Sequence, residues 1–143
     1  MRPLTILEAE HIAHRLAVEL MDYTTEPIPA FDTRYPHKLE SCLEQPFQCF
    51  AGNDLYEGLY RKAAVLFYLV TKNHPFQNGN KRMAVTLTLT FLYRNEVFLE
   101  MPTEVLYKIA LSVAENDDQL SIEAAVDQLS DIFERYAKSM LDN

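Results

Sequence analysis

The sequence predicts an all-α domain, a bundle of about six helices with one small flap or hairpin before the central helix. Apolar residues recur at helical spacing in most segments of the chain, and strict strand-like alternation occurs in one segment alone. The chain has 143 residues, of which 48% are hydrophobic, enough for one compact core. We therefore expect a single domain that covers residues 1–143.

The first predicted helix opens at Thr5, where Thr5 and Glu8 have the spacing of a capping box. Its apolar stripe has the 3.6-residue period of a helix that covers a core. The stripe consists of Ala9, Ile12, Ala13, Leu16, Ala17 and Leu20. Residues 22–35 then read as a loop, because Pro27 and Pro29 interrupt any periodicity.

The middle of the chain predicts a short helix, a flap and a long helix. Pro36 opens the short helix, which buries Leu39, Cys42 and Leu43 and ends before Pro46. The aromatic stretch 47–53 is typical of a small hairpin or an extended flap, and both remain open. Residues 54–57 form a second capping pattern. We expect a long helix from there to about Asn73, apolar on almost every side and therefore central.

The segment after residue 80 is ambiguous from its periodicity. Thr86–Phe91 alternates as a strand does, yet the same residues as a helix place Ala84, Leu87 and Phe91 on one face. Context favours a helix from Lys81 to about Asn95, because a lone strand would lack partners. Two more helices are predicted, over about 103–116 and from Ser121 onward.

Charge is distributed unevenly along the chain. The formal net charge is −8, but the 38 residues from Gly58 to Asn95 contain no Asp or Glu and six Lys or Arg, so the remaining 105 residues carry −8 − 6 = −14. The overall acidity argues against a protein that binds nucleic acid or an anionic membrane with its whole surface. The basic segment indicates a local anion site.

Several classes of protein are not expected from the composition. No apolar run approaches the ~18 residues of a membrane span, and Glu8 and Glu10 break any signal-peptide apolar region, so we expect a cytoplasmic protein without membrane attachment. Cys42 and Cys49 match no zinc or redox spacing. We expect two buried thiols.

The stretch His74–Arg82 carries the chemistry. Gly79 adopts positive φ at low cost, and a turn of this kind followed by a helix N-terminus presents backbone N–H groups to an anion. Lys81 and Arg82 are unfavourable at a helix N-terminus unless an anion lies there, which favours a bound phosphate. His74 changes protonation near neutral pH and suits a general base. The alternative is a plain helix–helix connection with an Asn-Gly turn.

The pattern His-Pro-Phe-x-x-Gly-Asn-Lys-Arg at 74–82 resembles the Fic/Doc family, and specifically its Doc (death-on-curing) branch. Leu39-Glu40-Ser41 with Pro46-Phe47, and the stretch 90–95, are similar to flanking family segments. The resemblance implies the six-helix Fic core and a set of roles. These are a base at His74, an anion hole at Gly79 and Asn80, phosphate binding at Lys81 and Arg82, and a target-docking flap at Phe47, Gln48, Cys49 and Phe50.

Two departures from the AMP-transferring Fic pattern bear on the activity. Lys81 stands where that pattern has a second Gly, and Val85 stands where it has a final Arg. Both are similar to the Doc branch, which implies a toxin of a toxin–antitoxin system that transfers phosphate from ATP to a Ser, Thr or Tyr hydroxyl of a cellular protein, a translation factor in the family's case. The alternatives are a Fic-type AMP-transferase and a catalytically weakened Fic fold that acts as a binding or regulatory module.

A third departure concerns the metal. Asn78 stands where the family usually has an Asp or Glu for Mg²⁺, and an amide oxygen binds Mg²⁺ without the charge that favours carboxylates. We therefore expect a weak Mg²⁺ site. The stretch 130–134 approaches the family's inhibitory motif, but Arg135 replaces its Gly or Asn. The resemblance thus favours a separate antitoxin as partner.

Overall fold

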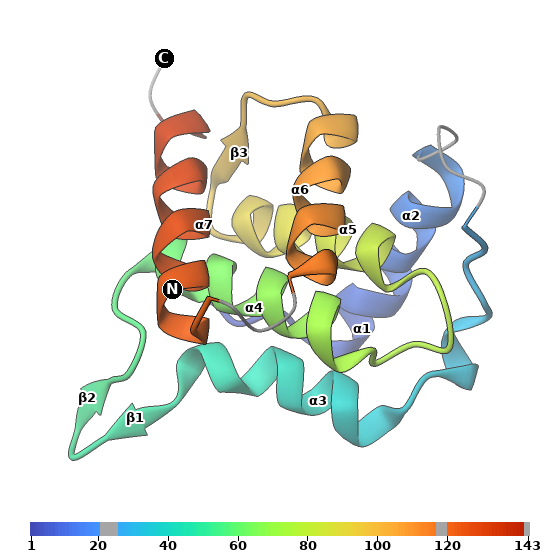
Figure 1. Cartoon of the computed structure of the whole chain (residues 1–143), viewed down its shortest axis with the longest axis horizontal. Helices are drawn as coiled ribbons and strands as arrows, with labels where there is room; N and C mark the ends of the chain where they lie inside the picture. Colours follow the sequence, from blue (N-terminus) through green and yellow to red (C-terminus); the bar gives the residue numbers. More distant parts are fainter. Residues whose placement is uncertain (21–25, 117–119, 142–143) are drawn as a thin grey trace.

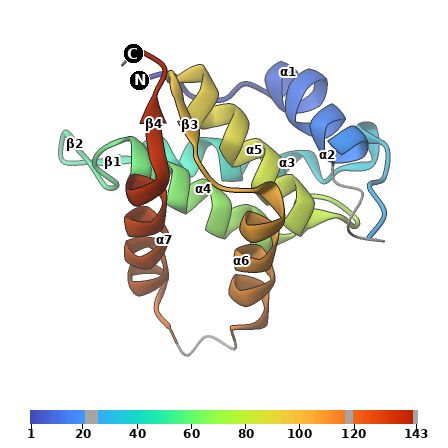
Figure 2. The same ribbon diagram turned by 90° about the horizontal axis from the view of Figure 1, so that it is seen from above.

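The computed structural model describes residues 1–20, 26–116 and 120–141, and they form a mostly helical bundle (Figure 1). Helices α4 (Leu59–Asn73) and α5 (Asn80–Arg94) pack against each other in the middle. Helices α6 (Thr103–Glu115) and α7 (Ile122–Tyr136) flank them on one side (Figure 2). The all-α prediction is confirmed.

The N-terminal helix begins as predicted. Both hydrogen bonds of the capping box between Thr5 and Glu8 are present at α1 (Ile6–Glu8), and the helix continues through a π-helical stretch, η1 (Ala9–His14), into α2 (Arg15–Leu20). Three alanines of the stripe, Ala9, Ala13 and Ala17, are fully buried. Ile12 is 40% exposed, contrary to the prediction, and the Leu20 side chain lies outside the described part of the chain.

The short helix and the hairpin follow the sequence prediction. Helix α3 (Pro36–Glu44) has proline in its first turn and buries Leu39, Cys42 and Leu43. A short 3-10 turn precedes α3 at Phe31–Thr33, and a second one follows it at Gln45–Phe47. Strands β1 (Cys49–Phe50) and β2 (Asn53–Asp54) come next and pair antiparallel. Ala51 and Gly52 both have positive φ, the geometry that a two-residue hairpin turn requires. The hairpin is thus the correct one of the two alternatives.

The start of the central helix was predicted too early. Helix α4 begins at Leu59 after Gly58, and Asp54 does not cap it. Asp54 instead pairs with Cys49 in the hairpin, and its carboxylate lies 3.0 Å from the Lys62 ammonium. Gly58 has a positive φ of +87°, which is not helical, so the helix cannot run through this residue from Asp54. From Ala63 to Val70 almost every side chain is buried, as predicted.

The ambiguous segment is a helix. In α5, the hydroxyl of Thr86 donates to the carbonyl of Arg82 and that of Thr90 to the carbonyl of Thr86. These bonds back to the preceding turn satisfy hydroxyls that are buried in the core. The threonines therefore adopt the helix that the core requires, despite their strand-like alternation.

One small sheet was missed. Strands β3 (Val97–Leu99) and β4 (Ala137–Ser139) pair antiparallel and join the end of α5 to the end of α7. Each strand has three residues, too short for a periodic signal. No helix among the described residues combines the length and the apolarity needed to cross a membrane.

Candidate anion-binding and catalytic site

Residues His74–Arg82, here called the anion cradle, connect the C-terminal end of α4 to the N-terminal end of α5. His74 and Gly79 both have left-handed backbone conformations, with φ of +51° and +75°. Between them Phe76 is buried in the core and contacts Phe31 at 6.0 Å between ring centroids. Two left-handed residues thus turn the chain, and one aromatic side chain anchors it.

Asn80 holds the cradle in shape. Its Oδ1 accepts from the backbone N–H of Phe76 and its Nδ2 donates to the backbone carbonyl of Phe76, both at 2.9 Å. The Asn80 side chain is 5% exposed, so these bonds form away from water. A buried amide that satisfies both backbone groups of one residue fixes that residue firmly.

The same amide orients His74. Because Oδ1 of Asn80 is committed to a backbone donor, its Nδ2 faces Nδ1 of His74, at 3.4 Å. An amide N–H donates, so Nδ1 is the acceptor and a neutral His74 carries its proton on Nε2. The nitrogen of His74 that can take up a proton is therefore Nδ1, which the Asn80 amide contacts.

The N-terminus of α5 is not capped by a side chain. Gly79 occupies the N-cap position and has no side chain, whereas Ser121 caps α7 by accepting from Ala124. The first-turn N–H groups of α5 have no partner within the helix and carry partial positive charge. Helices α3, α4 and α6 also begin without a side-chain cap, so this feature alone does not distinguish α5. At α5 it coincides with Lys81 in the first turn and with His74 next to Asn80.

Lys81 already has an anionic neighbour in this structure. Its Nζ lies 3.5 Å from Oε2 of Glu26, and the same carboxylate accepts from the hydroxyl of Tyr107 at 2.9 Å. The side chains of Lys81 and Glu26 are 26% and 16% exposed. The anion that two cations at a helix start require is thus supplied by the chain itself.

Arg82 faces backbone carbonyls. Its guanidinium donates from Nη1 to the carbonyl of Glu26 at 2.6 Å and from Nη2 to the carbonyl of Ala17 near the end of α2. The side chain is buried, and its Nε has no partner among the described residues. In this arrangement Arg82 ties α2 and the residue-26 segment to α5, and its role in phosphate binding stays a prediction.

A segment far from the motif forms the wall of the cradle. A Cβ added to Gly79 would lie 2.5 Å from Cδ1 of Ile28 and 2.8 Å from the carbonyl oxygen of Pro27, so only glycine fits there. Further along the segment, the backbone N–H of Tyr35 donates to the carbonyl of Pro75 at 2.8 Å. Residues 26–35, predicted only as a loop, therefore cover the cradle.

The donor set for a metal ion is poor. Oδ1 of Asn78 already accepts from the backbone N–H of Gly79 at 2.8 Å. Within the described ranges, no three His, Cys, Asp or Glu side chains come close enough together to hold a metal ion. Asn78 alone does not fit a protein-held Mg²⁺ site.

The hairpin lies at the other end of α4 from the cradle (Figures 1 and 2). Because α4 has 15 residues, about 22 Å of helix separates them. Phe50, at the hairpin tip, is 76% exposed, and Phe47 at its base packs on Phe91. The structure does not bring the predicted docking residues next to His74, and target docking on the hairpin stays a prediction.

The two cysteines differ from the prediction of two buried thiols. Burial raises the pKa of Cys42 to about 12. Cys49 is exposed and lies 3.3 Å from Oδ1 of Asp54, whose carboxylate raises the pKa of this thiol. The prediction failed for Cys49 because the short strand places it on a surface hairpin.

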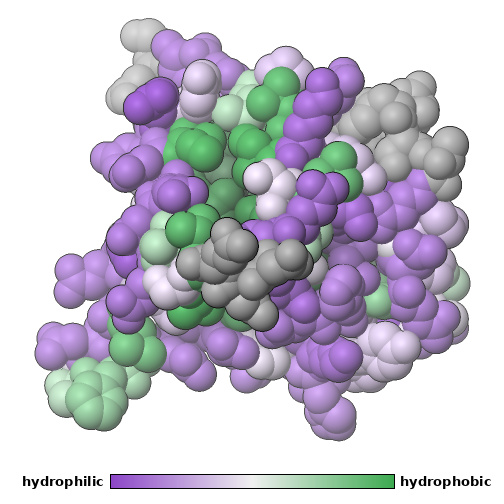
Figure 3. Space-filling view, in the orientation of Figure 1, coloured by the Kyte–Doolittle hydropathy of each residue, from purple (hydrophilic) through white to green (hydrophobic). Residues whose placement is uncertain are grey.

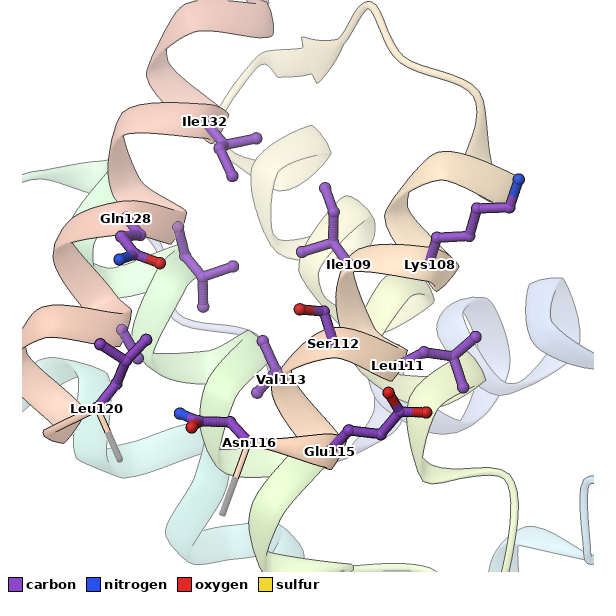
Figure 4. A pocket seen from close by; sticks show the side chains of 12 residues that line it. Lys108, Ile109, Leu111, Ser112, Val113, Glu115, Asn116, Leu120, Gln128 and Ile132 are labelled. Carbon is purple, nitrogen blue, oxygen red and sulfur yellow. The ribbon is translucent and has the colours of Figure 1, made fainter. Parts of the chain in front are cut away.

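A hollow of about 720 Å³ lies between α6 and α7 and is lined by no residue of the cradle. Figure 3 shows its apolar floor, and in Figure 4 Ile109, Val113 and Ile132 point into it from the two helices. None of the predicted site residues lines it. Size alone therefore does not identify the site; the cradle is identified by its chemistry.

Two residues beside the cradle, Glu26 and Tyr107, were not predicted from the sequence. Glu26 precedes Arg82 by 56 positions and Tyr107 follows Glu26 by 81. No spacing rule links residues so far apart. The sequence indicated only that Lys81 and Arg82, two cations at a helix N-terminus, require an anion nearby, and it did not indicate which residue supplies it.

Comparison with known proteins agrees with the motif. A profile of the Fic/DOC family matches residues 5–92, which is more than half of the chain. A protein named Toxin Doc from Mycolicibacterium smegmatis is 36% identical over 67 residues, which are 47% of this chain and 52% of that relative. The chain thus matches about half the length of this curated relative. Together with the motif and the helical fold, these matches show that the chain belongs to the Fic/DOC family and support its Doc branch.

Proposed function

We propose that this chain is a Doc-like toxin that transfers a phosphate group from ATP to a Ser, Thr or Tyr hydroxyl of a cellular protein. The observation that carries the proposal is the combination, at one turn, of three features: the uncapped N-terminus of α5, Lys81 in its first turn, and His74 in contact with Asn80. Free N–H groups and one ammonium stabilise a phosphate whose charge is redistributed during transfer.

The proposed reaction balances as a simple transfer. The hydroxyl oxygen of the target forms a bond to the terminal phosphorus of ATP, and the bond from that phosphorus to the bridging oxygen breaks, so that ADP leaves. The hydroxyl proton passes to His74. The acceptor nitrogen of neutral His74 is Nδ1, so the proton goes to that atom, and the 3.4 Å contact between Nδ1 and the Asn80 amide is given up. Asn80 itself stays in place through its two bonds to Phe76.

Two departures from the AMP-transferring pattern, both similar to the Doc branch, support phosphate transfer over AMP transfer. Val85, which stands in place of the final arginine of the AMP-transferring pattern, is fully buried in the core. Lys81, in the first turn of α5, occupies the place of a glycine in that pattern. These differences distinguish this cradle from the one that the AMP-transferring pattern describes.

Partners follow from the same proposal. A toxin of this class requires an antitoxin protein, and the family resemblance makes a translation factor the proposed target. The alternatives are an AMP-transferase and a weakened Fic fold that binds without catalysis. Asn78 favours the second alternative, because its amide carries no charge for a metal ion.

Labelled ATP tests these proposals directly. The chain is incubated with cell lysate and ATP labelled on either the α- or the γ-phosphate. We expect γ-label on protein, and a loss of about 10²–10⁴-fold for His74→Ala, as for removal of a general base. His37→Ala is the matched control, because the His37 side chain is fully exposed.

Each other outcome has a defined meaning. Transfer of the α-label would replace phosphate transfer by AMP transfer. Absence of either label with the wild type and with Asn78→Asp, while His74→Ala remains as toxic to cells as the wild type, would overturn the enzymatic proposal in favour of the binding module.

A further inference from the structure

We propose that the chain holds its own anion cradle closed, and that an anionic ligand binds by displacing the Glu26 carboxylate from Lys81. This inference concerns the regulation of the proposed site and rests on the proposed function. It assigns to Glu26 the place that a phosphate oxygen of the ligand would occupy.

The first support is the position of the carboxylate. Oε2 of Glu26 lies 3.5 Å from Nζ of Lys81 and also accepts from the Tyr107 hydroxyl. With its side chain 16% exposed, Glu26 is largely withdrawn from water, so its charge acts at short range with little screening. In the resting chain this carboxylate neutralises Lys81.

The second support is that the backbone of the same segment covers the turn. The carbonyl of Glu26 accepts from Arg82, and Pro27 and Ile28 lie against Gly79 at the contact distances given above. At its other end, the carbonyl of Pro29 lies 2.9 Å from Nε2 of His14. The segment 26–29 is therefore held at both of its ends, by Arg82 and by His14, and its middle lies against Gly79 of the turn.

The third support is the chemistry of exchange. A phosphate and a carboxylate repel each other, so both do not share one ammonium closely. A ligand that reaches Lys81 has to move the Glu26 carboxylate away, and the interaction it breaks lowers its apparent affinity. If Glu26 only positioned Lys81, the opposite would hold, and loss of its charge would weaken binding or leave it unchanged.

The test measures binding without catalysis. Inorganic tripolyphosphate and ATP are titrated calorimetrically into the wild type, Glu26→Gln and the control Glu19→Gln, which removes an exposed carboxylate on α2 that pairs with Arg15. Glutamine retains an oxygen to accept from Tyr107. We expect about tenfold tighter binding for Glu26→Gln at low salt and no change for Glu19→Gln.

A double variant locates the effect. In a Lys81→Met background, Glu26→Gln is expected to bring no gain, because the contested cation is absent. Circular dichroism melts verify that every variant is folded. Equal or weaker binding by Glu26→Gln than by the wild type would overturn this inference and leave the proposed function intact. Absence of binding in all folded variants would overturn both.

Discussion

The two ends of α4 are next to two turns that differ in burial. The anion cradle at the C-terminal end buries Phe76 and Asn80 and is covered by residues 26–29. The hairpin at the N-terminal end consists of two two-residue strands with exposed side chains. Both turns use left-handed residues. In the cradle, Pro75, Phe76, Gly79 and Asn80 are buried, whereas every residue of the two hairpin strands is exposed.

The hairpin is attached at its base by one buried cation. The Lys62 side chain is 3% exposed, and its ammonium donates to the Asp54 carboxylate and the Tyr56 carbonyl and lies over the ring of Phe47. A preorganised cradle suits a site that stabilises a transition state. The hairpin tip has exposed side chains. We therefore expect substitutions in the cradle to lower stability more than substitutions at the hairpin tip.

The largest expected loss comes from the centre of the cradle. Asn80→Ala leaves the N–H and the carbonyl of Phe76 buried without partners, and we expect it to lower the free energy of unfolding by about 3 kcal/mol. Urea denaturation measures this change. Asn78→Ala, which removes one bond to the Gly79 N–H, is the matched control and is expected to cost less than ~1 kcal/mol. Equal losses would contradict the central role of Asn80.

A pair of glycine substitutions compares the two turns directly. Gly79→Ala adds a Cβ that collides with Ile28 and Pro27, and we expect a loss of about 2–3 kcal/mol. Gly52→Ala has a similar positive φ but no atom within 4 Å of the new Cβ, so we expect about 1 kcal/mol. Thermal or urea unfolding of both variants measures the difference. If the two glycines cost the same, the segment 26–28 does not press on the cradle.

Release of the hairpin base is expected to have a moderate effect. Lys62→Met keeps the apolar stem and removes the charge, leaving the Asp54 carboxylate without its cation, and we expect a loss of about 1–2 kcal/mol. Hydrogen exchange should rise in residues 49–54 and remain unchanged in the cradle. Faster exchange in residues 74–80 as well would show that the two turns are coupled.

The smallest effect concerns thiol reactivity in the hairpin. Asp54 raises the pKa of Cys49, so Asp54→Asn should speed alkylation of Cys49 near pH 8 severalfold. Cys42, with its pKa raised by burial, is the internal control and should stay unreactive. An unchanged rate at Cys49 would show that the Asp54 carboxylate does not control this thiol.

The same carboxylate predicts a dependence of stability on acid pH. Lys62 lowers the pKa of Asp54 below its ordinary value through a hydrogen bond and charge. The stabilisation is therefore fully present above the unfolded value near 3.8 and is lost as the pH falls through the lower, folded value. Acid titration of wild type against Asp54→Asn should show this loss in the wild type alone.

Much of the fold was predictable because its signals are local. The capping box at Thr5, the proline that opens α3 and the apolar run of α4 each involve residues within a few positions of one another. The start of α4 was predicted wrongly at Asp54 because Gly58 adopts a positive, non-helical φ and the Asp54 carboxylate pairs with Lys62 at the hairpin. The capping pattern at residues 54–57 shows neither feature.

The candidate site was predictable in its motif and less so in its surroundings. The left-handed Gly79 and the helix that follows it were expected from the Asn-Gly-Asn stretch alone. Asn80 was expected in an anion hole, and the structure shows it as the brace between Phe76 and His74. Its side chain, rather than its N–H alone, shapes the loop.

The sequence by itself determined the helices, the turn at Gly79 and the demand for an anion beside Lys81, since each depends on neighbouring residues and their hydrogen bonds. Only the tertiary structure determined that the anion beside Lys81 is the Glu26 carboxylate. Glu26 reaches Lys81 because α2, α5 and α6 pack so that Ala17, Arg82 and Tyr107 surround the residue-26 segment. A contact across more than fifty positions arises from packing, which no local pattern encodes.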